Sequence, residues 1–328
     1  MPASAIRQMA GSADAELDLL EILKKGGGIG KPSQVQVVID VTGDLGGAIA
    51  TELAAGPSRV KGVILGNSSP VRPIPESVEL VKVDPEISGS IAGVCKGAET
   101  VYDCYEPGPS DAKDAMHRMS QQALSASIES GAGLVVASHL VNSPDDNLRA
   151  ETAVLRAHSA GLVRAMVVRL PQLYGPWVVN GLWETIFTSV AKKNKAHWMG
   201  DPSVKRSLLY IEDAATMVAL LGKSLWAYGR TWTLPGPEAL DGNEFMTTAF
   251  KVAGLEPRIG HWGRGIMLTG SILGADSKKM LSLPYDFYAP FVLADRDFLE
   301  SFPSVRFTPH EKAILDTLKW FESRMTSI

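Results

Sequence analysis

Apolar residues recur along the chain in short, often β-branched runs, and longer amphipathic stretches lie between them. The runs predict strands at 35–41, 60–65, 78–83, 100–105, 134–139 and 165–170. Stretches with apolar residues at helical spacing predict helices at 87–97, 110–130 and 146–158. Strands that alternate with helices are typical of a parallel sheet, so the pattern predicts an α/β fold with a doubly wound parallel sheet.

The first strand leads into a glycine-bearing turn and then a helix, which is the opening unit of a nucleotide-binding α/β fold. Backbone N–H groups and the positive end of the helix can hold a pyrophosphate there. The candidate cofactor-binding residues of the turn are Thr42, Gly43, Asp44, Leu45 and Gly46. The alternative is a structural connection that binds nothing.

One common dinucleotide fingerprint has three glycines, each three residues apart. Gly43 and Gly46 fill the second and third places, but Asp40 stands at the first. Two like charges ~4 Å apart near a protein surface repel by roughly 4 kcal/mol. We therefore expect dinucleotide binding, of NAD or NADP, to be weak or absent.

Asn67 and Ser68 follow the second strand and complete the candidate cofactor site. Dinucleotide enzymes often carry an acid here that binds the adenosine ribose, or a base that accepts a 2′-phosphate. This chain has no acid at that point, and Arg72 is the only base close by. If a dinucleotide binds, Arg72 favours NADP over NAD.

After Pro171 the hydrophobic pattern loosens. Helices are expected at 214–225, 240–254 and 308–325, and one more strand at 231–234. Before the first strand, only 14–25 has the spacing of a short amphipathic helix, and the glycines that follow read as linker.

Composition narrows the classes of function. The net charge of −4 comes without a basic run, which argues against nucleic-acid binding. No apolar run approaches the ~18 residues of a membrane span. Cys95 and Cys104 are too few for a disulfide framework and fit a reducing cytosol, and metal-ligand spacing is absent. We expect a cytoplasmic protein without a metal, acting on a small-molecule substrate.

Three motifs in order resemble the extended and atypical short-chain dehydrogenase/reductases, particularly the epimerase/dehydratase-like and NmrA-like members. Val41–Gly47 resembles their opening turn. Arg169–Pro176 is similar to their Arg-Pro-x-x-x-Tyr-Gly-Pro segment, with Leu170 in place of the first proline. Leu209–Ala215 looks like their Tyr-Val-x-Asp segment. The resemblance covers Val35 to Phe321.

The resemblance implies a Rossmann-like sheet with a smaller C-terminal substrate lobe. We divide the chain into an N-terminal extension and linker (1–33), a Rossmann-like domain (34–175) and a mainly C-terminal lobe (176–328). Some segments of this last part are expected to return to the Rossmann core.

The family's acid–base signature, Tyr-x-x-x-Lys, is missing from its expected place. Counting back from Glu151, which resembles the acid that usually follows the motif, puts Ser143 and Asn147 at the two positions. Neither can replace a phenol of depressed pKa held by a lysine at neutral pH. The family's serine, at the end of the fifth strand, matches Ser138.

Proton transfer would then fall to other side chains at the carboxyl ends of the strands, where open α/β sheets bind ligands. His139 titrates near neutrality, and Tyr105 and Glu106 end the fourth strand. With Ser138 these are the candidate catalytic residues. Successive strand residues point to opposite faces, so Ser138 and His139 are not expected to face the same side.

Tyr174, Trp177, Trp183 and Arg206 are the candidate substrate-binding residues, because they lie where relatives build the substrate lobe. The tryptophans could line an apolar pocket for a flat or hydrophobic molecule. The alternatives are that the aromatic residues fill the core and that Arg206 is an exposed surface arginine.

These departures from the family predict an atypical enzyme that acts on a small hydrophobic or aromatic molecule by non-redox chemistry: isomerisation, cyclisation or dehydration. One alternative is an NADP-dependent reductase or epimerase with a non-standard proton donor. Another is a catalytically silent member that binds a dinucleotide or a partner. Because relatives pair through the helices after the fourth and fifth strands, we expect a homodimer through 110–130 and 146–158.

Overall fold

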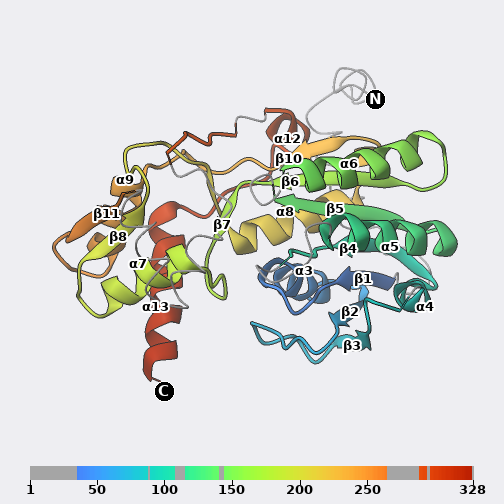
Figure 1. Ribbon diagram of the computed structural model, residues 1–328, viewed down its shortest axis with the longest axis horizontal. Helices are drawn as coiled ribbons and strands as arrows, with labels where there is room; N and C mark the ends of the chain where they lie inside the picture. The colour runs from blue at the N-terminus through green and yellow to red at the C-terminus, as the bar shows by residue number, and fades with distance from the viewer. Residues whose placement is uncertain are drawn as a thin grey trace.

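The computed structural model describes residues 35–87, 89–107, 115–139, 144–263, 288–293 and 296–326, without the side chains of 139 and 144–147. In these residues the centre is a seven-stranded, fully parallel sheet in the order β10-β6-β5-β4-β1-β2-β3 (Figure 1). Its strands are β1 (Val35–Ile39), β2 (Arg59–Leu65), β3 (Val78–Val83), β4 (Ala98–Asp103), β5 (Gly133–His139), β6 (Ala165–Leu170) and β10 (Thr231–Thr233). The predicted doubly wound parallel sheet is confirmed.

Helices cover both faces of this sheet (Figure 1). One face carries α4 (Ser90–Cys95), α5 (Ala115–Ser130) and α6 (Pro144–Ser159). The other carries α3 (Asp44–Ala54) and α8 (Ile211–Lys223), which also contact each other. Both β10 and α8 come from the sequence after residue 176, so the chain returns to the sheet after starting the lobe.

The lobe stands at one side of the sheet (Figure 1). Among the described residues it holds the helices α7 (Gly181–Ala191), α9 (Gly242–Val252) and α13 (His310–Thr326), and a parallel pair of strands, β8 (Ala196–Met199) and β11 (Ile259–Trp262). A second parallel pair, β7 (Gln172–Tyr174) and β9 (Leu208–Tyr210), lies between lobe and sheet. The short helices η1 (Leu225–Ala227) and α12 (Arg296–Ser301) complete the order, and α12 contacts β10.

Buried apolar side chains of the described residues form two clusters on opposite faces of the sheet. The cluster beneath α4, α5 and α6 includes Val37, Val101 and Val136. The cluster on the opposite face runs from Val38 without interruption into the lobe, as far as Phe245. Burial of apolar surface contributes roughly 25 cal/mol per Å², so the lobe is held to the sheet by a shared core.

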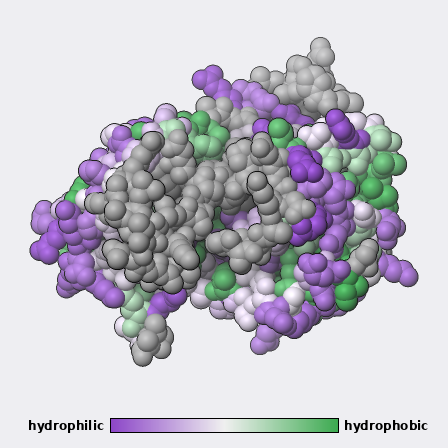
Figure 2. All heavy atoms as spheres, in the orientation of Figure 1, coloured by the Kyte–Doolittle hydropathy of each residue, from purple (hydrophilic) through white to green (hydrophobic). Residues whose placement is uncertain are grey.

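The surface differs from this interior. Hydrophilic residues spread over both lobe and sheet domain on the visible face, and apolar residues form smaller, separate areas (Figure 2). None of the described helices has both the length and the apolar character to cross a membrane. The extension 1–33, with its expected helix at 14–25, lies outside the described residues, as do the first five positions of the helix expected at 110–130.

Candidate functional site

The turn after β1 keeps its tight path although aspartate replaces the first glycine of the fingerprint. Asp40 adopts a left-handed backbone conformation with φ of 60°, which aspartate tolerates better than most residues. Its Oδ1 accepts a hydrogen bond of 2.7 Å from the Thr42 hydroxyl. A Cβ atom on Gly46 would lie 2.1 Å from the Asp40 carbonyl oxygen. The start of α3 therefore approaches the end of β1 so closely that only glycine fits at position 46.

The chain's own carboxylates lie against the N–H groups of this turn. The Gly43 N–H donates to the Asp40 backbone carbonyl at 3.2 Å. The backbone N–H groups of Gly43 and Glu106 face the Asp40 carboxylate and partly offset the rise in its pKa that burial causes. The Asp44 side chain accepts from the Leu45 N–H at 2.6 Å. A helix N-terminus of this kind is an anion site, and here the anions are internal. The segment after β4 lies against this turn, since the Cys104 N–H donates to the Ile39 carbonyl at 3.3 Å.

A second buried carboxyl group stands next to it at the end of β4. Asp103 accepts from the Ser120 hydroxyl of α5 at 2.9 Å and from the Tyr105 N–H at 3.3 Å. Burial raises the pKa of Asp103 to about 6, and the charge of Asp40 adds to the rise. Burial also raises the pKa of Asp40, and the charge of Glu106 acts in the same direction. Acidic side chains therefore gather at this end of the sheet, and weak or absent dinucleotide binding stays a prediction.

The predicted cofactor residues after β2 make local contacts. The Asn67 Oδ1 accepts a 2.6 Å hydrogen bond from Lys82 of β3. The Ser68 hydroxyl donates to the Leu65 carbonyl at 2.8 Å. Both contacts shape the turn itself, and a role in cofactor binding stays a prediction for these two residues.

Arg72 lies against the start of α3. The Val71 N–H donates to the Thr42 carbonyl at 3.0 Å, which brings the loop onto the turn. A Cβ on Gly47 would meet the Arg72 side chain at 2.8 Å. The Arg72 Nη2 pairs with Glu212 of α8 at 2.8 Å, while its buried Nη1 has no hydrogen-bond partner among the described residues.

Ser138 belongs to a buried network that the sequence reasoning did not foresee. It is fully buried, and its hydroxyl donates to Glu151 Oε1 of α6 at 2.7 Å. The other Glu151 oxygen accepts from Arg169, at 2.6 Å from Nη2 and 3.1 Å from Nε. Ser138 and Arg169 are register partners in neighbouring parallel strands. The Ser138 proton is committed to Glu151, so toward any ligand this hydroxyl can only accept.

A signal for this network was present in the sequence. Glu151 resembles the acid that follows the missing Tyr-x-x-x-Lys pair, and Arg169 opens the second family-like motif. What the sequence could not supply was the register of β5 against β6, which sets Ser138 beside Arg169.

The remaining candidate catalytic residues lie around the same strand ends. The strand β4 ends at Asp103, so Tyr105 and Glu106 lie just beyond it and do not end it as predicted. Tyr105 is half-buried, and Glu106 is exposed and close enough to Asp40 to raise its pKa. His139 is the last residue of β5, paired with Leu170, and its side chain lies outside the described residues. Ser143 and the Asn147 side chain are also outside them. Catalytic roles for Tyr105, Glu106 and His139 stay predictions.

Tyr174 and Trp183 are fully buried in the cluster shared by sheet and lobe. The Trp183 Nε1–H donates to the Leu173 carbonyl at 2.8 Å, and the Tyr174 hydroxyl lies 2.9 Å from His310 Nδ1. The His310 Nε2 is 2.9 Å from the Glu238 carbonyl and must donate to it, so Tyr174 donates to His310. These surroundings favour the packing alternative for both aromatic residues.

The two other candidate substrate-binding residues, Trp177 and Arg206, have different surroundings. Trp177 is half-buried with φ of 72°, and its ring centroid lies 5.0 Å from that of Trp320 on α13. Arg206 is only 1% exposed, so the surface-arginine alternative is wrong. Its Nε donates to Gln172 and its Nη1 to the Ala289 carbonyl, both at 3.2 Å. A substrate role for Trp177 or Arg206 stays a prediction.

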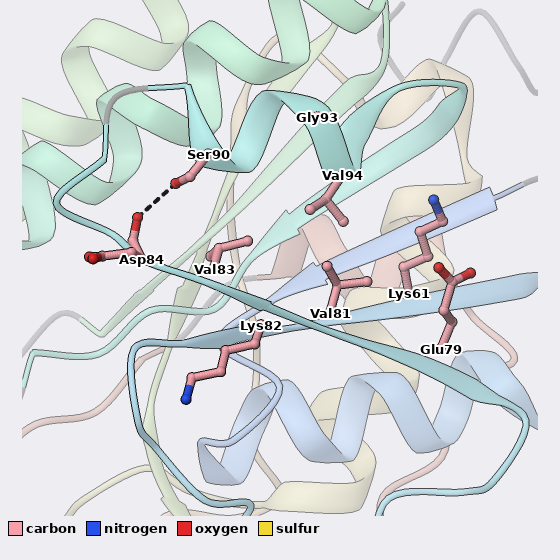
Figure 3. Close-up of a pocket in the computed structure, with 9 residues that line it drawn as sticks. All are labelled: Lys61, Glu79, Val81, Lys82, Val83, Asp84, Ser90, Gly93 and Val94. Atoms are coloured by element: carbon pink, nitrogen blue, oxygen red, sulfur yellow. Dashed lines mark hydrogen bonds between the residues drawn. The ribbon is translucent and has the colours of Figure 1, made fainter.

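A surface hollow of about 440 Å³ lies elsewhere, between α4 and the edge strand β3 (Figure 3). Val81, Val83 and Val94 form its apolar part, and Lys61 and Lys82 point away from each other (Figure 3). None of the candidate catalytic or substrate residues lines it. The described residues contain no group of three or more His, Cys, Asp or Glu arranged for a metal ion.

Comparisons with known proteins agree with this architecture. Residues 147–227 match the model of the NAD dependent epimerase/dehydratase family. That segment holds the second and third family-like motifs and leaves out the Asp40 turn. No curated protein matches the sequence.

Several solved structures are similar over about nine-tenths of this chain. An epimerase from Methanothermobacter thermautotrophicus has a TM-score of 0.75 at 15% identity, covering 90% of this chain and 94% of its own. A UDP-glucose 4-epimerase from Thermotoga maritima has 0.73 at 13%, covering 89% and 100%. A double mutant of the dTDP-glucose 4,6-dehydratase DesIV from Streptomyces venezuelae, with NAD bound, has 0.71 at 13%, covering 90% and 98%.

At these identities the similarity shows the fold. The chain thus has the Rossmann-like fold of the epimerases and dehydratases of the extended short-chain dehydrogenase/reductase superfamily, and its residues 147–227 carry the sequence pattern of the NAD dependent epimerase/dehydratase family.

Proposed function

We propose that this protein is an atypical enzyme of the epimerase/dehydratase fold. It converts a small hydrophobic or aromatic molecule by isomerisation, cyclisation or dehydration, without a tightly bound dinucleotide. The observation that carries the proposal is the occupied turn, where the Asp40 carboxylate accepts from the Thr42 hydroxyl and lies beside the backbone N–H groups of Gly43 and Glu106. A pyrophosphate at this place would have to displace that carboxylate and lie beside its charge.

The serine network supports altered chemistry. In Tyr-x-x-x-Lys enzymes the lysine-held phenol moves the proton, and this chain has serine and asparagine at those positions. Ser138 donates to Glu151 and is shielded from solvent. We assign proton transfer to His139, the last residue of β5, or to Tyr105 or Glu106, which follow β4. The half-buried pair Trp177 and Trp320 supports a flat or apolar substrate.

Calorimetric titration of the full chain with NAD(H) and NADP(H) tests the dinucleotide part. We expect no binding in the micromolar range for the wild type. Asp40→Gly should bind at least tenfold more tightly, because it removes a like charge and keeps the left-handed turn. Asp40→Asn is the matched control, since it removes the charge and keeps the size. Micromolar affinity of the wild type for either dinucleotide would contradict the proposal.

One observation favours the NADP-dependent alternative. The Nη1 of the buried Arg72 has no hydrogen-bond partner in the part of the chain that the structure describes, and it lies close to the start of α3, where a 2′-phosphate would find a cation. If the wild type binds NADPH with micromolar affinity, and Arg72→Gln weakens NADPH much more than NADH, the protein is the reductase or epimerase of that alternative. Equal weakening of both dinucleotides would instead indicate damage to the Arg72–Glu212 pair.

The proton-transfer part is tested once mass spectrometry of the native protein identifies a copurifying molecule. His139→Ala, Tyr105→Phe and Glu106→Gln are then assayed side by side. Loss of the true acid or base should cost on the order of 100-fold in kcat. Ser138→Ala should cost less, since it removes one neutral hydroxyl donor from a network. Near-normal turnover of all three variants would show that the chemistry lies elsewhere.

A further inference from the structure

Two separate contacts hold the start of the C-terminal helix α13 to the rest of the molecule. In the first, Thr308 donates to the Asp213 carboxylate of α8, from its backbone N–H at 2.7 Å and from its hydroxyl at 2.8 Å. The second runs through His310, the first residue of α13, whose ring joins the Tyr174 hydroxyl of β7 to the Glu238 carbonyl. Of the two, the second contains a histidine, which titrates near neutral pH.

The geometry of the second contact fixes which of its atoms carry hydrogen. A carbonyl oxygen can only accept, so the His310 Nε2, which lies 2.9 Å from the Glu238 carbonyl, carries a hydrogen. In the neutral ring Nδ1 is then an acceptor, and the Tyr174 hydroxyl donates to it over 2.9 Å. Within the described part of the chain, this is the one hydrogen bond that the Tyr174 hydroxyl makes.

Protonation of the His310 ring is incompatible with this arrangement. Both ring nitrogens then carry hydrogen, so the Nδ1–H points at the hydrogen of the Tyr174 hydroxyl. Tyr174 is fully buried against the rings of Trp183 and Phe245, and the described residues offer its hydroxyl no acceptor in place of Nδ1. A buried hydroxyl without an acceptor is costly, so the packed arrangement favours the neutral ring.

We propose that His310 is a pH-sensitive fastener, which holds the start of α13 to β7 while its ring is neutral and releases it when the ring is protonated. The released part is the first turn of the helix, because Ile314, Leu318 and Phe321 further along stay in the core. At neutral pH the fastener is closed, as the structure shows it. The inference does not depend on the reaction that the protein catalyses.

The charged and titratable groups around this ring come from several elements. On α13 itself Glu311 follows the ring, and Glu238 lies before α9, so two carboxylates favour the protonated ring. From the sheet side, Asp213 of α8 and Tyr210 of β9 act on the Tyr174 hydroxyl. The helices α7 and α9 also pack on α13, but none of their groups acts on the ring. The ring therefore stays neutral because of its burial and its hydrogen bonds, and not because of a neighbouring positive charge.

The direction of the pH dependence follows from these contacts. Burial lowers the pKa of His310 from its ordinary 6.5, and the nearby acids offset this only in part. A released ring regains the ordinary pKa, so the released form binds a proton more tightly than the fastened form. The fastener therefore contributes its full stabilisation above about pH 6.5 and loses it as the pH falls below that value.

Hydrogen exchange of the full-length protein, followed by mass spectrometry at pH 7.5 and pH 5, tests the fastener. Rates are corrected for the intrinsic pH dependence of amide exchange. We expect the protection of amides in 308–314 to fall roughly tenfold at the lower pH, because one buried hydroxyl loses its acceptor. Amides of β2 in the sheet serve as the internal control and should keep their protection.

Two variants distinguish the fastener from general loosening of α13. His310→Gln has a donor for the Glu238 carbonyl and an acceptor for Tyr174 but does not titrate, so protection at 308–314 should be the same at both pH values. Thr308→Val is the matched control, because it removes a hydrogen bond of the first contact. Its protection should be lower than that of the wild type at both pH values, and the fall between them should remain.

Tyr174→Phe gives a further test that does not rely on the folding of His310→Gln. It keeps the buried ring and removes the hydroxyl hydrogen that opposes the protonated His310, so the fall in protection between pH 7.5 and pH 5 should become smaller. Protection at 308–314 that does not change with pH in the wild type would overturn the proposal. So would a fall of full size in His310→Gln or in Tyr174→Phe.

Discussion

At the scale of single residues, Asp40 shows that backbone conformation and charge are separable properties of a nucleotide-binding turn. Its φ of 60° reproduces the path that a glycine gives. Its carboxylate nevertheless places a negative charge of the protein itself in the turn, where a nucleotide-binding fingerprint would hold the anion of a ligand. The location of this turn was predictable from the sequence, because fingerprint spacing needs no tertiary contact. The partners of Asp40 after β4 were not, because they depend on how β1 and β4 pair.

Asp103 gives a pH prediction at the same scale. Its raised pKa means that the folded state binds a proton more tightly than the unfolded chain, so this group's stabilisation is lost as the pH rises from about 4 to about 6. In Asp103→Asn that loss should disappear. The unfolding free energy of the variant, relative to wild type, should therefore increase by about 2 kcal/mol between pH 4 and pH 7.

Urea unfolding followed by circular dichroism at the two pH values measures this difference. Asp316→Asn, a change in a half-exposed residue of α13, is the control and should show no comparable increase. Wild-type and Asp103→Asn curves that differ by the same amount at both pH values would refute the assignment.

At the scale of elements, the Ser138–Glu151–Arg169 network connects α6 to the carboxyl ends of β5 and β6. Glu151→Gln should lower the unfolding free energy by about 1–3 kcal/mol, because hydrogen bonds to a charged group are lost. The Arg169 side chain is 34% exposed, and solvent screens its charge. We therefore expect a loss of unfolding free energy near the lower end of this range.

A double-mutant cycle with Arg169→Met separates the pair from its surroundings. The double variant should lose less stability than the sum of the single losses. The exposed Lys312–Asp316 pair of α13 provides a matched control cycle, with a coupling of about 0.5 kcal/mol or less. Additive losses for Glu151 and Arg169 would mean that the contact contributes nothing.

Pairing through α5 and α6 remains a prediction at this scale. Most of the apolar stripe of α5, such as Met119 and Ala123, is buried beneath the helix against the sheet. Ile128 and Leu148 are still 37% and 56% exposed. We expect a dimer by light scattering, and Ile128→Asp with Leu148→Asp should dissociate it. Leu80→Asp on β3, 46% exposed, is the control. A monomeric wild type would rule the interface out.

Most elements between residues 35 and 170 were predictable because their strands and helices are long enough to show a period of their own, although the helix expected at 87–97 is shorter, Ser90–Cys95. The strands β7, β8, β9 and β11 span only three or four residues, too few for alternation to be recognised. The pairing of β8 with β11 joins positions about 60 residues apart. By contrast, the helix expected at 240–254 is present as α9, and its start is marked by a local signal, a capping box formed by Asp241 and Glu244.

At the scale of the whole molecule, sheet and lobe share a core, so neither part is complete alone. A fragment ending at residue 175 lacks α8 and β10. We expect it to show no cooperative unfolding transition in urea, because the face of the sheet that carries α3 and the outer edge of β6 stay uncovered. The full-length chain is the reference and should unfold in one transition. A cooperative transition in the fragment would show that 34–175 folds as an independent domain.

The route of the chain between sheet and lobe also matters while the protein is being made. After β6 the ribosome must supply β7, α7, β8 and β9 before α8 and β10 arrive to close the sheet, about 60 residues later. At roughly 5–20 residues per second this takes several seconds. During that time the nascent chain exposes an apolar sheet face and an unpaired strand edge, the two features that promote aggregation and recruit chaperones.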